Sequence, residues 1–371
     1  MSPRTLRPLI AALLATPLAL ESSIPAGMEL VWSDEFEYSG APDPAKWTHQ
    51  VGAGGWGNNE DQTYTDSLEN SRVEDGKLVI EVRQVFDSRT PRYTSARLTT
   101  QGKASWKYGR MEIRAKVPSE TGTWSAIWML PENGVYGDGG WPDNGEIDIM
   151  EHVGYEEDPL FKALAGDPEL PNIHGTVHTH KRNGMENTGI GESAYFADAS
   201  TEFRVYAINW TDGRIEWEVD GVPYFVLERD PLLPSRNPPP PEDIWQWWPF
   251  DQPFHLILNI AIGGNWGGHF NSTLYPDDSP YGTTGVDKDG VWPQRMEVDY
   301  VRVFAPSSGE TWKGLPVDEA GNAQTDSWLG PINVAGAPWI YSYDLQRFLY
   351  MSAALEETFR TDDQWIFFPK P

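Results

Sequence analysis

Three acidic residues lie close together in one short, otherwise apolar stretch of the chain: Glu146, Asp148 and Glu151. The alternation of these acids with Ile147 and Ile149 predicts a β-strand that has one acidic and one apolar face. Carboxylates this close raise the pKa of one group while another stays ionised, which is the division of roles that acid–base or nucleophilic catalysis needs. The alternatives are a polar outer strand face and a calcium site, and the lack of interspersed Lys or Thr disfavours them.

Strand parity separates these acids unless the strand is irregular. Because side chains alternate along a strand, Glu146 and Asp148 share a face and Glu151 falls on the opposite one. One extra residue at Met150 would return Glu151 to the acidic face. The sequence therefore predicts a β-bulge at Met150 as the condition for the three acids to act together.

Glycoside hydrolysis is the reaction that suits such a row of acids. It requires two carboxyl groups on either side of the scissile oxygen, about 5 Å apart in retaining enzymes and farther apart in inverting ones. Two acids on one strand face, with a third between them, are compatible with the shorter separation. On chemistry alone either Glu146 or Glu151 could be the nucleophile, with Asp148 tuning its neighbour.

Tryptophan side chains are the second part of the predicted chemistry, because indole rings stack on the apolar C–H faces of sugars. Trp124 and Trp128 have the same parity on one predicted strand. Trp106, Trp141 and Trp266 lie near glycine-rich turns, from which a side chain can reach a cleft. For any single tryptophan the alternative is packing in the core.

Sugar hydroxyl groups need polar partners, for which Asn58, Arg97 and His178 are candidates. His178 also shares strand parity with His174 and His180, a pattern that a zinc site could use. Three histidines on a strand lack the helical ligand pair of many zinc sites. The sequence therefore favours His178 as a cleft residue beside the carboxylates and His180 as an exposed surface residue.

The elements that must position these residues are short alternating segments. Without amphipathic helices between them, they predict an all-β fold of two antiparallel sheets. A sheet that bends over a substrate would form a concave face lined by aromatic side chains. The predicted strands are residues 30–36, 76–83, 93–99, 108–117, 123–130, 146–151, 174–180, 203–210, 214–221, 254–261 and 296–304.

Composition limits the partners and the compartment. The chain has 371 residues, no Cys and a net charge of −27, which argues against nucleic acid and anionic membrane surfaces as partners. Residues 1–22 are expected to be a signal peptide, since Arg4 and Arg7 precede an apolar run too short to span a bilayer. We therefore expect a secreted protein, extracellular or periplasmic, and a monomer.

The domain organisation follows from where the strand pattern stops. A catalytic domain is expected over residues 28–305, and residues 306–371 form a linker and an extension of unknown role. The extension carries two related aromatic segments, 338–343 and 364–368, each of which could be a strand of a small hairpin unit.

Taken in order, these segments resemble glycoside hydrolase family 16. Residues 146–151 match its Glu-x-Asp-x-x-Glu signature in the bulged form. The similarity covers about residues 28–305 and is closest to the bacterial laminarinase-like branch, whose members cut internal β-1,3 bonds of β-glucans. Residues 179–187 are more charged than that branch leads one to expect. The other segments that carry the resemblance are 32–36, 56–60, 109–114, 124–128, 175–178, 248–255, 259–268 and 298–302.

The resemblance implies a β-jelly-roll and a retaining double displacement. It implies Glu146 as the nucleophile, Glu151 as the general acid/base and Asp148 as the assisting acid. No cofactor is expected for catalysis, and a structural Ca²⁺ ion is implied at the carbonyl groups of Glu35 and Gly76 and the carboxylate of Asp299. The implied substrate contacts are Asn58, Arg97, Trp124, Trp128, His178 and Trp266.

Three readings of the function remain at this point. The first is a secreted endo-β-1,3-glucanase acting on laminarin-type β-glucan. The second is the same fold and mechanism on mixed-linkage β-glucan, agarose, porphyran or carrageenan. The third is a non-catalytic carbohydrate-binding protein, against which the intact acidic triplet argues.

Overall fold

The computed structural model describes residues 24–25, 27–87, 90–234, 239–268 and 290–307, together with the backbone of short strands between Thr311 and Tyr350. The predicted signal peptide and the segment 364–368 lie outside the described residues. The chain divides into two compact units, Leu30–Pro306 and the segments on either side of it. The domain boundaries drawn from the sequence stay predictions.

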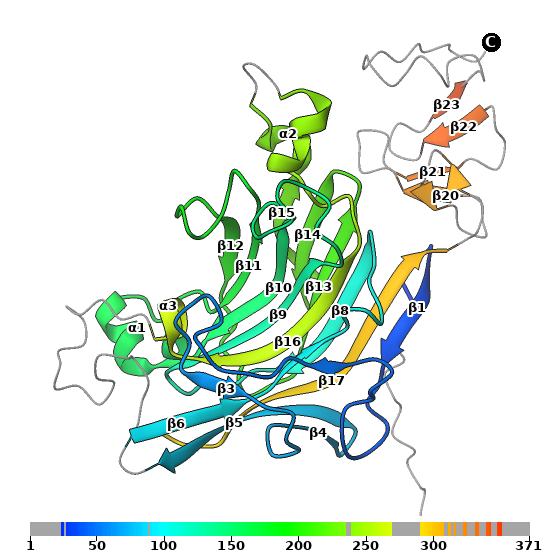
Figure 1. The fold of residues 1–371 in the computed structure, drawn as a ribbon. Helices are drawn as coiled ribbons and strands as arrows, with labels where there is room; N and C mark the ends of the chain where they lie inside the picture. Colours follow the sequence, from blue (N-terminus) through cyan, green and yellow to red (C-terminus); the bar gives the residue numbers. More distant parts are fainter. Residues whose placement is uncertain are drawn as a thin grey trace, which may run out of the picture. The chain divides into compact units, whose positions relative to one another are not determined.

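The larger sheet of the main unit forms one layer of a sandwich (Figure 1). Along the order given below and for β4 with β5 the pairings are antiparallel, except for the parallel pair β3–β6. Its order is β15 (Val222–Glu228), β14 (Arg214–Val219), β13 (Arg204–Thr211), β8 (Gly109–Lys116), β17 (Gln294–Pro306), β5 (Lys77–Asp87), β6 (Thr90–Ser95) and β3 (Gln62–Tyr64), with β1 (Met28–Asp34) on β17 and β4 (Ser71–Glu74) on β5.

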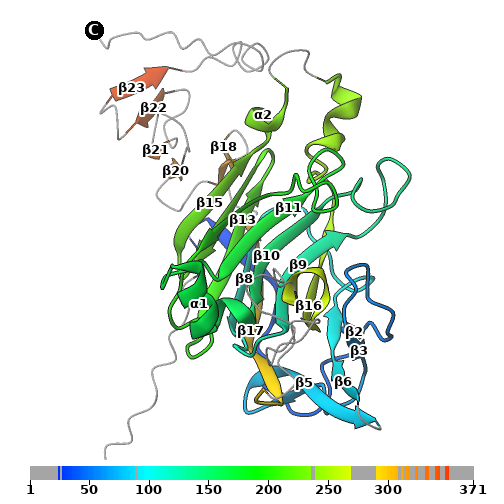
Figure 2. The ribbon, with the colours of Figure 1, turned by 90° about the vertical axis from the view of Figure 1, so that its left-hand side faces the viewer.

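The smaller sheet forms the second layer, and its central strands run side by side (Figure 2). All of its pairings are antiparallel. The two open sheets confirm the predicted all-β sandwich. The order is β12 (Ile190–Ala194), β11 (Ile173–His178), β10 (Glu146–Val153), β9 (Thr123–Pro131), β16 (Phe254–Ile262), β7 (Arg97–Thr99) and β2 (Thr48–His49).

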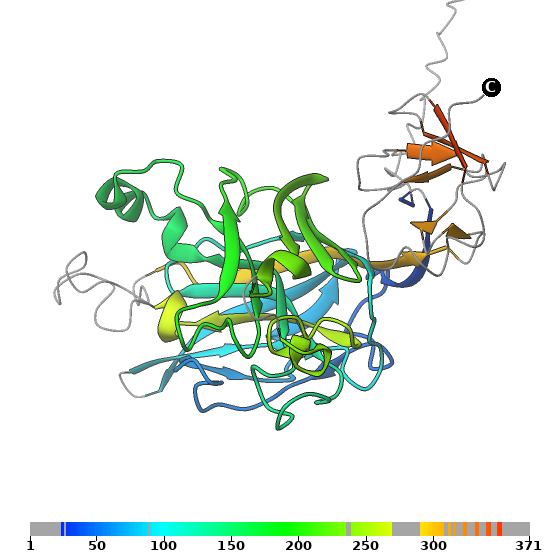
Figure 3. The same cartoon turned by 90° about the horizontal axis from the view of Figure 1, so that it is seen from above.

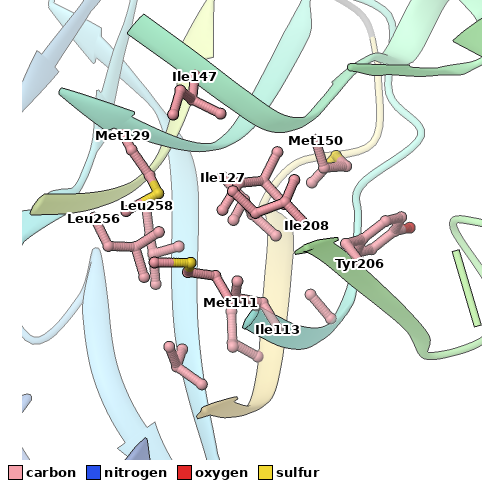
Figure 4. Close-up of a cluster of buried hydrophobic side chains, with 14 of the residues drawn as sticks. Met111, Ile113, Ile127, Met129, Ile147, Met150, Tyr206, Ile208, Leu256 and Leu258 are labelled. Atoms are coloured by element: carbon pink, nitrogen blue, oxygen red, sulfur yellow. The ribbon is translucent and has the colours of Figure 1, made fainter. Parts of the chain in front are cut away.

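The core lies between the two sheets and consists of the apolar half of each alternating strand (Figure 4). Ile127 and Ile147 from the smaller sheet are fully buried, as are Ile113 and Ile208 from the larger one. Burial of a side chain of this size contributes about 1.5–3 kcal/mol relative to exposure. The polar half of the smaller sheet is thereby turned away from the core.

One predicted strand is divided between the two sheets. The sequence predicts a single strand over 93–99, whereas the structure has β6 in the larger sheet and β7 in the smaller one, separated by Ala96. Ala96 is fully buried, and the hydroxyl of the preceding Ser95 donates to the carbonyl of Ile260, 2.7 Å away. The switch of sheets brings Arg97 onto the smaller sheet.

Short helices occupy several connections, which the strand pattern did not predict. The helix α1 (Pro159–Ala165) begins at the N-cap Asp158, whose Oδ1 accepts from the backbone of Leu160, and ends at Gly166 in the left-handed conformation. It buries none of its residues and lies at the periphery of the unit (Figure 3). The others are η1 (Gly154–Glu157), α2 (Arg229–Leu232), η2 (Pro241–Gln246) and α3 (Gly264–Gly267).

The second unit contains small antiparallel sheets. The predicted aromatic strand at 338–343 corresponds to β22 (Trp339–Ser342), which pairs with β23 (Arg347–Tyr350). β22 also pairs with β21 (Pro331–Asn333), and β21 with β20 (Asn322–Gln324). A separate pair is β18 (Thr311–Trp312) with β19 (Leu315–Pro316). Within the described part of the chain, no helix is long and apolar enough to cross a membrane.

Candidate active site

The acidic strand β10 contains the irregularity that its parity requires. The register shifts directly after Asp148 against both neighbouring strands, β9 and β11. On the β9 side Met150 pairs with the residue next to the partner of Asp148, so Ile149 is the extra residue. Ile149 and Met150 are both buried, and Glu151 returns to the cleft side. The predicted bulge is therefore present, one residue earlier than expected.

Glu146 receives contacts from a loop, through Trp141, and lies beside His178 at the end of the neighbouring strand β11. The indole Nε1 of Trp141 donates a hydrogen bond of 2.7 Å to Glu146 Oε2. His178 Nδ1 accepts from the backbone N–H of Gly184 at 3.1 Å, which leaves the proton of the neutral ring on Nε2. That Nε2 lies 3.9 Å from Glu146 Oε1 and 3.3 Å from Asp148 Oδ2. Trp141 is thus a direct donor to Glu146, which the family resemblance implies to be the nucleophile, and His178 lies beside both Glu146 and Asp148.

Glu151 occupies the other end of the acidic row. Its Oε1 accepts a hydrogen bond of 2.9 Å from Trp124 Nε1. The ring of Trp124 meets Trp266 edge to face, with centroids 5.5 Å apart. Trp266 in turn contacts the ring of His174, which is held by Glu156 at 2.8 Å. A chain of packed rings thus fixes the donor that orients Glu151.

Burial controls the titration of all three acids. It raises the pKa of Glu146 well above its ordinary range, and the charge of Asp148 raises it further. Burial likewise raises the pKa of Asp148, followed by the charge of Glu151. It also raises the pKa of Glu151, against the hydrogen bond from Trp124. The cluster therefore retains a proton at pH values at which exposed carboxyl groups would be ionised.

A cleft of about 810 Å³ contains the three acids. All six residues predicted to contact the substrate line it, although the sequence places them on several different strands and loops. Their roles in substrate binding stay predictions. The residues are Asn58, Arg97, Trp124, Trp128, His178 and Trp266.

Arg97 forms part of the cleft wall and is held from three sides. Its guanidinium lies 4.7 Å from the ring centroid of Trp128 and 5.0 Å from that of Trp56. Its Nε donates to Gln50 Oε1 at 2.6 Å. The indole N–H of Trp128 is fixed by Asn259 Oδ1 at 2.7 Å. This packing presents a rigid cationic and aromatic surface to a ligand in the cleft.

Among the cleft residues that were not singled out from the sequence are Glu60 and Asn259. Glu60 accepts hydrogen bonds from Asn58 Nδ2 at 3.3 Å and from Gln62 Nε2 at 2.6 Å, and burial raises its pKa. Asn259 joins Trp128 to Tyr64, whose hydroxyl is 3.1 Å from Asn259 Nδ2. Both residues lie in segments that carry the family resemblance, 56–60 and 259–268. The sequence therefore marked these segments, but it assigned no role to Glu60 or Asn259.

The three tryptophans near glycine-rich turns differ in location: two line the cleft and one packs against the core. Trp141 and Trp266 line the cleft, as the sequence allowed. Trp106 instead packs edge to face on Trp32, with centroids 5.3 Å apart, and joins the periphery of the core. For Trp106 the alternative of core packing is therefore correct.

The three histidines do not converge on one point. His174 faces Glu156, His180 Nδ1 lies 2.6 Å from Asp143 Oδ1, and His178 faces the catalytic row. The zinc reading of these histidines is not supported, and His180 is a paired rather than a plain surface residue. Among the described residues, the group of acids and histidines with ligand atoms within 4.8 Å of one another is Glu146, Asp148 and His178.

Of the predicted calcium ligands, Asp299 lies on β17 of the larger sheet, Glu35 directly follows β1, and Gly76 lies between β4 and β5. Asp299 follows the last paired position of β17 with β5, and β5 begins directly after Gly76. Oδ2 of Asp299 is 2.6 Å from Nη1 of Arg114. The carboxylate of Glu35 accepts two hydrogen bonds from the guanidinium of Arg302. The Asp299 and Arg114 side chains are both more than one-third exposed, so their ion pair contributes little stability. The calcium site at these residues stays a prediction.

Comparison with known proteins finds similar sequences and structures over the part of the chain that contains the cleft. Residues 58–273 match the family model described as glycosyl hydrolases family 16. The β-glucanase of Rhodothermus marinus is 50% identical over 278 residues, which cover 74% of this chain and 85% of that protein. The laminarinase structure from Rhodothermus marinus has a TM-score of 0.62 at 48% identity and covers 76% of this chain and 98% of its own. SCLam, described as a non-specific endo-β-1,3(4)-glucanase, has a TM-score of 0.60 at 39% identity and covers 76% and 93%.

Proposed function

The chain belongs to glycosyl hydrolases family 16, and we propose that it is a secreted, retaining endo-β-1,3-glucanase that acts on laminarin-type β-glucans. The predicted family resemblance, β-jelly-roll fold and glycosidase class are confirmed. The observation that supports the mechanism is the bulged strand, which places Glu146, Asp148 and Glu151 together in the cleft.

The proposed reaction is a double displacement. The carboxylate of Glu146 attacks the anomeric carbon while Glu151 gives its proton to the departing glycosidic oxygen. A covalent glycosyl ester then forms on Glu146, and Glu151, now ionised, takes a proton from the attacking water. Asp148 lies between the two and holds a proton close to Glu146 in the resting site. Its protonation is coupled to the charges of Glu146 and Glu151, which change during the reaction. No metal or cofactor enters these steps.

Product analysis on laminarin tests this function. We expect NMR to show β-configured reducing ends at first, β-1,3-linked oligosaccharides, and internal rather than terminal cleavage. Release from lichenan or agarose without release from laminarin would overturn the β-1,3 assignment. The likeness to SCLam, described as a non-specific endo-β-1,3(4)-glucanase, makes mixed-linkage β-glucan the second candidate substrate. Binding of laminarin without any cleavage would favour the carbohydrate-binding alternative.

Replacing Trp141 by Phe is expected to shift the pH dependence of hydrolysis. The indole N–H stabilises the ionised form of Glu146, so its loss raises the pKa of that carboxyl group. Since the nucleophile must be ionised, the acidic limb of the kcat/KM profile moves to higher pH. The same change at Trp245, whose ring stacks on Tyr136, is the control and leaves that limb in place. A profile unchanged by Trp141→Phe would contradict the assignment.

Calcium is proposed to stabilise the protein at Asp299, with the carbonyl groups of Glu35 and Gly76. Chelation by EGTA is expected to lower the Tm by a few degrees, and added calcium to restore it, since a ligand of the folded state alone stabilises that state. The change Asp299→Asn should remove this response. The matched control is Asp212→Asn, an exposed acid elsewhere on the surface. A Tm that changes with neither EGTA nor added calcium would rule the site out.

Export is proposed from the basic and apolar pattern of residues 1–22. A high-molecular-weight polysaccharide substrate supports the proposal, because it does not enter cells intact. Mass spectrometry of the protein recovered from culture medium would test it, and a mature chain that begins after residue 22 is the expected result. The monomeric state is likewise a proposal, to be checked by light scattering.

A further inference from the structure

The indole of Trp217 reaches across the core from the larger sheet to the bulge of β10. Trp217 lies on β14, is fully buried, and stacks on Phe225 with centroids 4.5 Å apart. Its Nε1 donates a hydrogen bond of 2.8 Å to the backbone carbonyl of Asp148. That carbonyl is part of the peptide bond to Ile149, the extra residue of the bulge. The contact therefore joins one sheet to the irregular point of the other.

The hydrogen bond from Trp217 gives a donor to a backbone carbonyl at the point where the bulge interrupts the strand ladder. A bulge interrupts the ladder of backbone hydrogen bonds on which a regular strand relies. Here the register breaks on both sides directly after Asp148, in a fully buried part of the strand. A buried carbonyl requires a donor, and Trp217 supplies one from outside the sheet.

A glycine makes room for this indole. Gly175 lies on β11 between the partners of Asp148 and Glu151, opposite the bulge. A Cβ atom at Gly175 would lie 2.6 Å from Cδ1 and 2.9 Å from Nε1 of Trp217. Both distances are below any normal contact, and the indole is enclosed by its stacking partner. Only glycine at this position allows Trp217 to reach the Asp148 carbonyl.

We propose that Trp217 and Gly175 are positioning residues that hold β10 in the bulged register and so keep Glu151 in the cleft. Neither residue touches the substrate cleft, and both act through the backbone of β10. Without the hydrogen bond the strand can relax toward a regular ladder, which turns Glu151 toward the core. The inference rests on the proposed function, because it assigns a role within that reaction.

The change Trp217→Phe tests the proposal, since it keeps an aromatic ring and removes the N–H donor. Trp210→Phe is the matched control: Trp210 is also buried on the larger sheet, and its Nε1 donates to the Phe250 carbonyl at 3.1 Å, away from β10. Both variants lose a buried hydrogen bond and are expected to lower the Tm alike. Only Trp217→Phe should lower kcat on laminarin, by about 10- to 100-fold at similar KM, the scale of a ~1 Å misplacement of a catalytic group.

A second substrate separates misplacement of Glu151 from general damage. A β-laminaribiosyl fluoride needs no proton on its leaving group, and azide needs no general base when it attacks the glycosyl ester. With fluoride substrate and azide, Trp217→Phe is expected to approach the wild-type rate and to yield a β-glycosyl azide. If Trp217→Phe matches Trp210→Phe on laminarin, or loses both activities equally, the proposal is wrong.

A second variant, Gly175→Ala, keeps the proposal testable if Trp217→Phe folds poorly. Gly175→Ala keeps the indole but displaces it, and should give the same pattern: low activity on laminarin and retained activity on the fluoride with azide. Full laminarin activity in Gly175→Ala would also overturn the proposal. Failure of the proposed function itself has a different signature, because the wild-type protein would then release no product from laminarin.

Discussion

Replacing Glu146 by Gln is expected to lower kcat on laminarin by about 10⁶-fold, the scale seen when a catalytic nucleophile is removed. The amide is nearly isosteric, and its oxygen can still accept the hydrogen bond from Trp141, so KM and the Tm should change little. No covalent glycosyl ester can form on an amide, and the first step therefore stops. Single-turnover kinetics and thermal unfolding, measured side by side, separate loss of chemistry from loss of fold.

Azide distinguishes the nucleophile from the other acids. With Glu146→Ala, a small anion can enter the vacated space and attack the anomeric carbon directly, which yields an α-configured azide from an activated β-glycoside. Asp148→Asn serves as the control: it removes a neighbouring charge but leaves both reacting groups, and is expected to cost less activity. Wild-type turnover in Glu146→Gln would refute the assignment of the nucleophile.

Replacing Glu151 by Gln should produce a different defect, which depends on the leaving group. Without the proton donor, kcat on laminarin is expected to fall by about 10²- to 10⁴-fold. A glycosyl fluoride needs no protonation, so formation of the ester on Glu146 should continue at close to the wild-type rate. The ester then accumulates, because no base activates water, and mass spectrometry should detect it.

The leaving-group comparison also assigns the two outer acids without reference to related proteins. Azide should release the accumulated ester of the Glu151 variant as a β-glycosyl azide, the opposite configuration to that expected for Glu146→Ala. Identical azide products from both variants would show that the two roles have not been separated. Trp124→Phe is a milder companion, since it removes only the indole donor to Glu151.

The sequence predicted the sandwich and the acidic row well because both depend on local periodicity. Alternation placed the core residues, and parity alone required a bulge between Asp148 and Glu151. The exact extra residue could not be chosen, because Ile149 and Met150 are both apolar and both become buried. Which of them lacks a strand partner depends on the register of β9, which lies outside the segment itself.

Contacts between distant segments were harder to predict. Nothing near His180 in the sequence indicates Asp143 as its partner, and Trp106 resembles Trp141 in its glycine-rich surroundings yet packs on Trp32. The sheet switch at Ala96 also escaped prediction, because 93–99 alternates without interruption. In each case the outcome is set by loops and strands that meet only in three dimensions.

The extra residue in β10 also bears on how this strand could change during evolution. Deleting Ile149 would leave a single residue between Asp148 and Glu151, so a regular ladder would keep both acids on the cleft face by alternation alone. Trp128 and Arg97 on neighbouring strands would keep their places. A bulged and a regular form of the same acidic strand are thus one codon apart on this scaffold, and a lineage can move between them without rebuilding its binding surface.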